Sequence, residues 1–167
     1  MGYCQIAAND TIQLNSHQLR ALKNLEGSRM GIYEHVGWEG PHIQLRELIS
    51  NHLCICHCPS GYAGKEGELW YVRLAQPLEP ALAIYWVAMT TPYILTEVSK
   101  ADWIAFLKRA MVQMGGPNEP TRLRNLLKFC PEPLYWNEFI FKAYHHHQHD
   151  AIFLAGTPDI ESSLPHA

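Results

Sequence analysis

Three cysteines alternate along one apolar segment of this 167-residue chain, and thiols can hold a metal or act as nucleophiles. If residues 51–58 form a strand, Cys54, Cys56 and Cys58 share one face with His52. Alternate residues of a strand lie about 6.6 Å apart, whereas sulfurs around one zinc ion must lie within about 4 Å of each other. A regular strand therefore cannot deliver all three thiols to one ion. We expect buried cysteines that act as small apolar side chains, with Cys56 and Cys58 as the pair that a bend could offer to a metal.

A second cluster of residues that could carry chemistry is rich in imidazole. It consists of His145, His146, His147 and His149. His145 and His149 would share a helix face if the preceding helix continued that far. No glutamate separates a histidine pair as in a His-Glu-x-x-His metalloprotease, and His-rich surface segments bind metals adventitiously. We therefore predict no cofactor, and keep His145, His149, Cys56 and Cys58 as candidate ligands for zinc or another transition metal.

Glycines recur at every third position of the loop 61–67, which could let a ligand approach the backbone closely. Tyr62 and Lys65 in this loop offer a ring and a charge, and Arg73 in the next segment could bind an anion or extend its stem over apolar neighbours. The spacing differs from that of dinucleotide-binding and phosphate-binding loops, and a Gly-x-x-Gly of KH type would have to join helices. The plain alternative is a long hairpin loop with positive φ values. We predict Tyr62, Lys65 and Arg73 as the ligand-binding residues.

No catalytic residue can be assigned from a motif. A Gly-x-Ser-x-Gly elbow is missing, and a Cys/His dyad would need positions that the sequence does not bring together. Gly31-Ile32-Tyr33 matches the first half of a GIY-YIG nuclease signature, but no later strand carries the second half. We treat that match as coincidence.

The elements that must position these residues include three strands within 51–96. The middle one, 68–75, is apolar on both faces, which is typical of a central strand covered on each side. A glycine-bearing connection joins 51–58 to this strand and a proline-bearing one joins it to 81–91, so an antiparallel meander is the simplest topology. Two shorter strands are expected, at 3–6 and 151–155.

Apolar residues at helical spacing predict four helices, near 16–26, 99–114, 121–130 and 134–144. Ser16 and Ser99 are suitable N-caps. We therefore predict a single α+β domain over residues 1–167. An antiparallel β-sheet of three to five strands packs with four or so α-helices, and a tail from about residue 157 is mobile or lies on the surface.

Composition and charge exclude several function classes. The net charge is −3, and the most basic segment, 100–130, holds six Lys and Arg against two acidic residues on two helices. This is too little for a phosphate-binding surface, so we predict no nucleic-acid partner. No apolar run approaches the length of about 18 residues that a membrane helix needs. Five cysteines in an odd set, and no secretion signal, indicate a cytoplasmic protein without membrane association.

One stretch carries a family resemblance. From Pro59-Ser60-Gly61-Tyr62 through Gly67 to Arg73, the chain resembles a family of uncharacterised bacterial proteins. The resemblance covers only this hairpin and implies no activity.

Taken together, these patterns favour a cytoplasmic, non-enzymatic binding or protein-interaction module whose partner is a protein or a small molecule. Exposed aromatic residues beside glycine-rich loops are the main support. The alternative is a small metal-dependent or thiol-dependent enzyme that uses Cys54, Cys56 and Cys58 with nearby histidines.

Overall fold

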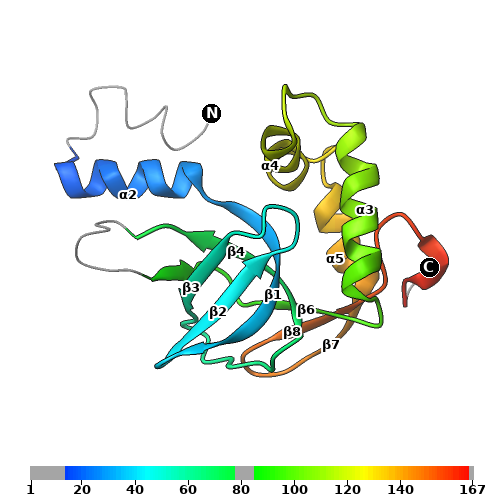
Figure 1. Ribbon diagram of the computed structural model, residues 1–167, viewed down its shortest axis with the longest axis horizontal. Coiled ribbons are helices and arrows are strands. Elements are labelled where there is room, and N and C mark those ends of the chain that lie inside the picture. The colour runs from blue at the N-terminus through cyan, green and yellow to red at the C-terminus, as the bar shows by residue number, and fades with distance from the viewer. Residues whose placement is uncertain (1–13, 78–84, 166–167) are drawn as a thin grey trace.

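Five strands close a barrel at the centre of the fold (Figure 1). They are β1 (Arg29–Glu39), β2 (His42–Glu47), β3 (Leu53–His57), β4 (Leu69–Ala75) and β5 (Trp86–Ala88). The computed structural model describes residues 14–77 and 85–165. The barrel closes because β1 pairs with both β2 and β4, and β5 lies between β3 and β4. β3 and β5 run parallel, whereas the other four contacts around the barrel are antiparallel.

The sheet continues beyond the barrel through β4. The additional strands are β6 (Tyr93–Thr96), β7 (Tyr144–His147) and β8 (Ile152–Ala155). β6 pairs with β4 and runs parallel to β8, and β7 pairs with β8 at the edge. β4 is buried on both faces, as the sequence predicted: Trp70 and Val72 belong to the barrel core, whereas Leu69 and Tyr71 belong to the core under the helices. β4 is therefore the wall between two cores.

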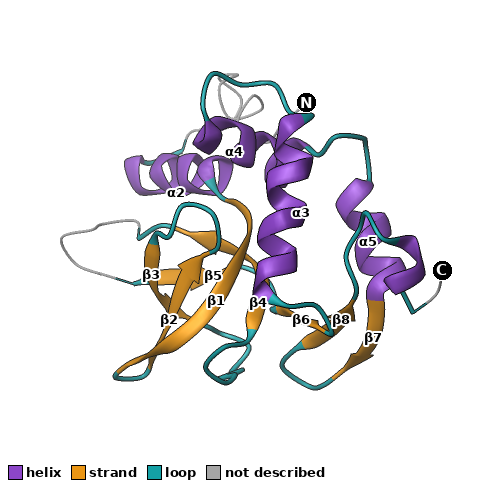
Figure 2. Cartoon of the chain, turned by 45° about the vertical axis from the view of Figure 1, so that its right-hand side comes forward, coloured by secondary structure: helices purple, strands orange, loops and turns teal. Residues whose placement is uncertain are grey.

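Helices cover the outer face of this wall (Figures 1 and 2). They are α3 (Lys100–Val112), α4 (Glu119–Phe129) and α5 (Tyr135–Ala143), while α2 (Ser16–Gly27) lies beside the barrel. Each of α3, α4 and α5 turns large apolar side chains inward, among them Trp103, Leu126 and Trp136. α2 has no buried residue. The four predicted helices are confirmed, and none of those in the described residues is long and apolar enough to cross a membrane.

The predicted single α+β domain is confirmed, but the simple antiparallel sheet is wrong. The described residues hold eight strands in a mixed sheet, five of them closed as a barrel. The expected meander is also wrong, because β5 inserts between β3 and β4. Alternation of side chains identifies the faces of a strand but not its neighbours. Residues 3–6 and 81–84, where strand was expected, lie outside the described residues.

Three further segments differ from expectation. The β1–β2 hairpin was not predicted, because polar residues and a register shift between His35 and Gly37 interrupt its apolar pattern. Residues 144–147 form β7 instead of extending a helix. The segment after Gly156 includes a short 3-10 helix, Glu161–Ser163, and the side chain of Leu164 reaches back into the core under the helices.

Candidate ligand-binding site

The alternating cysteines of β3 point into the barrel. Cys54 and Cys56 are 2% and 0% exposed, and Cys58 is half-buried with its sulfur 3.3 Å from the Ser60 hydroxyl oxygen. Burial raises the pKa of both Cys54 and Cys56 to about 12. These two thiols therefore stay protonated at neutral pH, which disfavours them as nucleophiles. Across the described ranges, no three His, Cys, Asp or Glu side chains converge closely enough to hold a metal ion.

The candidate histidines lie on an edge strand and the turn after it. His145 and His149 do not share a helix face, because α5 ends at Ala143. His145 Nδ1 lies 2.6 Å from His146 Nδ1. His149 lines an apolar groove of about 530 Å³ between α5 and β7.

The glycine loop packs against the end of the barrel. The Tyr62 hydroxyl donates a hydrogen bond to the Glu68 carboxylate at 3.1 Å, and the rings of Tyr62 and Trp70 lie 5.4 Å apart. A Cβ added to Gly64, at φ 68°, would approach the Trp70 ring to 2.7 Å. Lys65 is exposed. The loop thus packs against the rest of the protein through its own side chains. A ligand could bind there only on the outside of these contacts or by displacing them.

Arg73 reaches the C-terminal end of α2. Its Nε donates to Ser28 Oγ at 2.8 Å and its Nη2 donates to the Leu25 carbonyl at 3.0 Å. A cation at the C-terminal end of a helix is stabilising, because the last carbonyls carry partial negative charge. Tyr62, Lys65 and Arg73 therefore do not form one site: Tyr62 and Lys65 lie where β4 begins, and Arg73 lies near its end.

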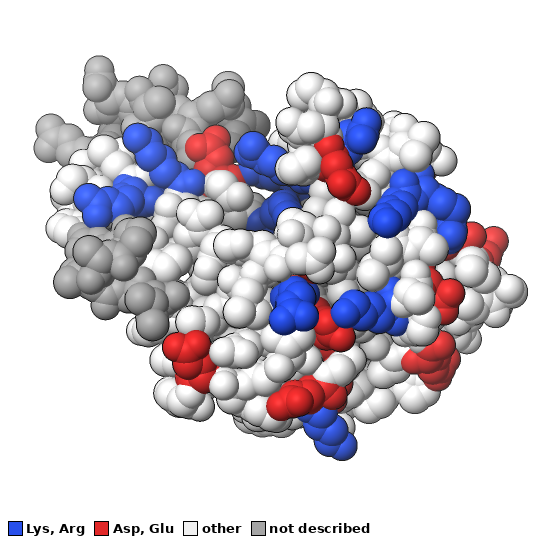
Figure 3. Space-filling model, viewed as in Figure 1, with Lys and Arg blue, Asp and Glu red and all other residues white. Residues whose placement is uncertain are grey.

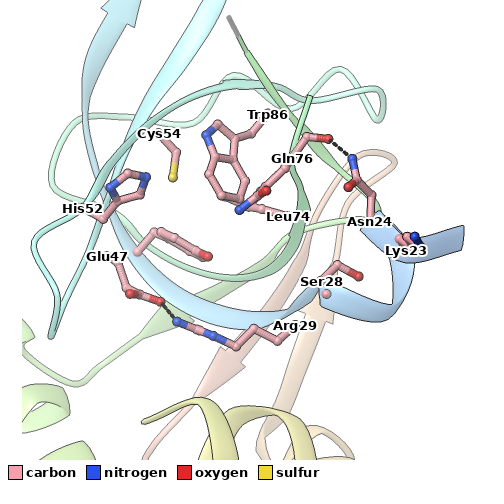
Figure 4. A pocket seen from close by; sticks show the side chains of 12 residues that line it. Lys23, Asn24, Ser28, Arg29, Glu47, His52, Cys54, Leu74, Gln76 and Trp86 are labelled. Carbon is pink, nitrogen blue, oxygen red and sulfur yellow. Dashed lines mark hydrogen bonds and ion pairs between the residues drawn. The ribbon is translucent and has the colours of Figure 1, made fainter. Parts of the chain in front are cut away.

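A cavity of about 280 Å³ opens at that second end of the barrel, beside α2 (Figure 4). Strand ends and the helix end supply its walls together, because β1 and β3 begin here while β2 and β4 end here. The residues that matter chemically are Lys23, Arg29, Tyr33, Glu47, His52, Cys54 and Trp86. We take this cavity as the candidate functional site.

The cavity contains an ion pair between neighbouring strands. Arg29 Nη2 lies 2.6 Å from Glu47 Oε1, and the Glu47 side chain is only 8% exposed. The second carboxylate oxygen, Oε2, accepts a hydrogen bond from the Ser50 hydroxyl. Arg29 Nη1 also donates to the Met30 carbonyl at 3.0 Å. Glu47 thus has both oxygens engaged, while the guanidinium keeps further N–H groups beyond these two contacts.

Tyr33 contributes a buried phenol beside this ion pair. The residue is 6% exposed, no hydrogen bond joins its hydroxyl to another described residue, and the hydroxyl is not among the fully enclosed polar atoms without a partner. Burial raises the pKa of Tyr33, and the negative charge of Glu47 raises it further, while Arg29 lowers it. The phenol therefore remains protonated and can donate a hydrogen bond into the cavity.

Aromatic and amide groups complete the walls. The His52 and Trp86 rings meet edge to face, with centroids 5.8 Å apart. Asn24 Nδ2 donates to the Gln76 carbonyl at 3.2 Å, which ties α2 to the end of β4 (Figure 4). The helix is thereby held as one side of the cavity.

Sequence reasoning did not find Arg29, Tyr33 or Glu47. A signal was present in the Gly31-Ile32-Tyr33 triplet and in the charge at Glu47 within a short apolar stretch. Only the β1–β2 register brings them together, since it pairs Tyr33 directly with Glu47.

Charged side chains show no single dominant patch on the face seen in Figure 3, where Lys and Arg over the helices are interspersed with Asp and Glu. Three of the six basic residues in segment 100–130 are already engaged. Lys100 pairs with Glu34, Arg109 pairs with Asp159, and Lys128 donates to the Glu26 carbonyl.

Comparison of the chain with protein-family models, with curated proteins and with solved structures finds no match.

Proposed function

We propose that this protein is a non-enzymatic binding module that takes a small polar molecule into the cavity at the barrel end beside α2. One observation carries the proposal. The Tyr33 hydroxyl lines the cavity while its residue is 6% exposed, and it has no partner among the described residues.

The access of water to that hydroxyl supports a binding role. The Tyr33 hydroxyl is not among the fully enclosed side-chain polar atoms that lack a partner, so water in the cavity can reach it. A ligand with an acceptor group could replace that water and take the hydrogen bond from Tyr33. A phenylalanine would fill almost the same volume but would offer no hydrogen bond.

The chemistry of the walls favours binding over catalysis. The thiol in the cavity, Cys54, has its pKa raised to about 12 by burial. Glu47 is held by Arg29 and by Ser50, one contact on each carboxylate oxygen, which fits a structural ion pair in the wall of the cavity. The raised pKa of Cys54 supports the binding module over the thiol-enzyme alternative.

Free thiols support a cytoplasmic location. Cys54, Cys56, Cys58 and Cys130 are all unpaired. Reduced cysteines are typical of the cytosol, where glutathione and thioredoxin keep thiols from pairing.

The test is a small-molecule screen by ligand-observed NMR on wild type and two variants. Tyr33→Phe removes the hydroxyl from the cavity, and Tyr71→Phe is the matched control, because Tyr71 is also a buried tyrosine, 1% exposed, but lies in the core under the helices and outside the cavity. We expect hits that Tyr33→Phe weakens about tenfold, a change of about 1.4 kcal/mol, while Tyr71→Phe binds as wild type does. Thermal midpoints should show that both variants remain folded. The proposal would be contradicted if the hits bound Tyr33→Phe as tightly as wild type, or if no molecule in the screen bound in this cavity.

A further inference from the structure

We infer that the ligand of this cavity carries a compact oxyanion, a carboxylate or a phosphate, that binds against Arg29 with the Tyr33 hydroxyl. This inference rests on the proposed binding function and adds the class of ligand. Three features of the cavity support it: its hydrogen-bond donors, its charge and the state of the adjacent helix end.

Tyr33 and Arg29 contribute hydrogen-bond donors to the cavity. Tyr33 stays protonated and offers its O–H. Arg29 has five N–H groups, of which the described structure uses one toward Glu47 and one toward the Met30 carbonyl. The acceptor that could have balanced them, Glu47, already receives Arg29 and Ser50. A ligand rich in acceptors therefore complements this site.

The charge of the residues that line the cavity also favours an anionic ligand. Lys23 and Arg29 are the cations of the lining, and Glu47 is its only carboxylate among the described residues. One positive charge is left without a partner inside the lining. The Arg29 side chain is 21% exposed, so its interaction with an anion is only partly screened by water.

The end of α2 would oppose an anion if its carbonyls were free, because the C-terminal end of a helix carries partial negative charge. These carbonyls are occupied. The Ser28 amide donates to Asn24 and Leu25, the guanidinium of Arg73 donates to Leu25, and the ammonium of Lys128 donates to Glu26. Two cations thus offset the helix end that borders the cavity.

The volume limits the ligand to a small molecule. At about 280 Å³ the cavity lies below the common range of roughly 300–1,000 Å³ for drug-sized ligands. A molecule of the size of an amino acid or a small organic acid fits these dimensions better than a nucleotide does.

The experiment uses matched probes that differ in charge and little in shape. Benzoate, benzamide and benzylamine are titrated into the full chain, with phenyl phosphate and inorganic phosphate as a second arm, and backbone amide shifts in ¹H–¹⁵N spectra locate binding. We expect benzoate or phenyl phosphate to shift the amides of Tyr33 and Glu47, with benzamide and benzylamine at least about tenfold weaker. The two arms decide between carboxylate and phosphate.

Variants separate charge from folding. Arg29→Gln should weaken the anion at least about tenfold, and Arg46→Gln is the matched control, because Arg46 is exposed on β2, adjacent in sequence to Glu47. Lys23→Gln changes an exposed side chain of the lining, so it tests the charge even if Arg29→Gln unfolds by leaving Glu47 unpaired. It should weaken the anion by a smaller factor.

The outcomes distinguish this inference from the proposed function. If benzamide or benzylamine binds in the cavity as tightly as benzoate, or if Lys23→Gln and Arg29→Gln both bind the anions as wild type does, the inference is overturned while the binding module stands. If neither these probes nor the screened molecules shift amides of the cavity, the binding function itself fails.

Discussion

The ring of Tyr33 lies over the backbone of Gly31, so close that a Cβ at position 31 would be 2.5 Å from ring atom Cε2 and from the hydroxyl oxygen. Real Cβ contacts are never that short, so only glycine allows this position of the ring. The two residues are two apart on β1 and share a face of the strand. The missing side chain at Gly31 therefore leaves room for the phenol next to Arg29 and Glu47.

Gly31→Ala is expected to destabilise the protein by about 1–3 kcal/mol, because the added methyl overpacks a closed core and displaces a rigid ring. Urea denaturation measures the change, and any ligand found for the cavity should bind more weakly. Gly115→Ala serves as control, since a Cβ there has no atom within 4 Å. Equal stability of Gly31→Ala and wild type would show that the ring can move freely.

Arg73→Met is expected to loosen the C-terminal end of α2. The substitution keeps an apolar stem but removes the hydrogen bonds to Ser28 and Leu25, which together stabilise by roughly 1–3 kcal/mol. Amide hydrogen exchange should become faster in residues 20–28 and stay unchanged in α3. Arg46→Met, at an exposed position of β2, provides the comparison. Unchanged protection of α2 would mean that Arg73 does not hold the helix.

The buried thiols predict a characteristic alkaline behaviour. The pKa of Cys54 and that of Cys56 are raised from about 9 to about 12. Between these values the unfolded chain releases protons that the folded chain retains, so the free energy of unfolding should fall as pH rises from about 9 to about 12. Below pH 9 this effect is absent. Denaturation of wild type and of a Cys54→Ala, Cys56→Ala variant would measure it, and an equal alkaline slope in both would contradict it.

Alkylation tests the same thiols independently. At neutral pH, iodoacetamide should modify Cys58 and Cys130 in the folded protein well before Cys54 and Cys56, because thiolates react and buried thiols with raised pKa hold little thiolate. Mass spectrometry of digested protein gives the order. Early modification of Cys54 would instead favour the thiol-enzyme alternative.

Binding to nucleic acid should be weak at physiological salt. Of the six basic residues in segment 100–130, Lys100 and Arg109 are in ion pairs and Lys128 caps α2, so few remain to neutralise phosphates. Fluorescence anisotropy with duplex and single-stranded oligonucleotides at about 0.15 M ionic strength should show no tight complex. Sub-micromolar binding that is lost on Arg122→Ala with Arg124→Ala would refute this.

Much of the fold could be predicted because its signals are local. The four helices follow from apolar spacing and from caps such as Ser99, whose hydroxyl accepts the Asp102 amide. The predicted cap Ser16 is wrong by one residue, because Asn15 caps α2 and accepts the Gln18 amide. The two-sided burial of 68–75 follows from its composition. The alternation of Cys54 and Cys56 with exposed Leu53 follows from the period of a strand.

Closure of the barrel could not be predicted in this way. It depends on which strands pair, and a strand's apolar pattern identifies its buried face without identifying its neighbours. The parallel contact between β3 and β5 joins segments about 30 residues apart, and the β1–β4 contact joins segments about 40 residues apart. No short stretch of the sequence indicates either of these two pairings.

The sequence by itself predicted that the cysteines of β3 are core residues, and the burial of Cys54 and Cys56 confirms it. Only the tertiary structure decided that Arg29, Tyr33 and Glu47 meet. Their side chains come together because strand pairing places β1 beside β2 in one register, Tyr33 opposite Glu47, and because α2 is held across that end of the barrel by Arg73 and Asn24. A site built from long-range pairing leaves no fixed spacing along the chain.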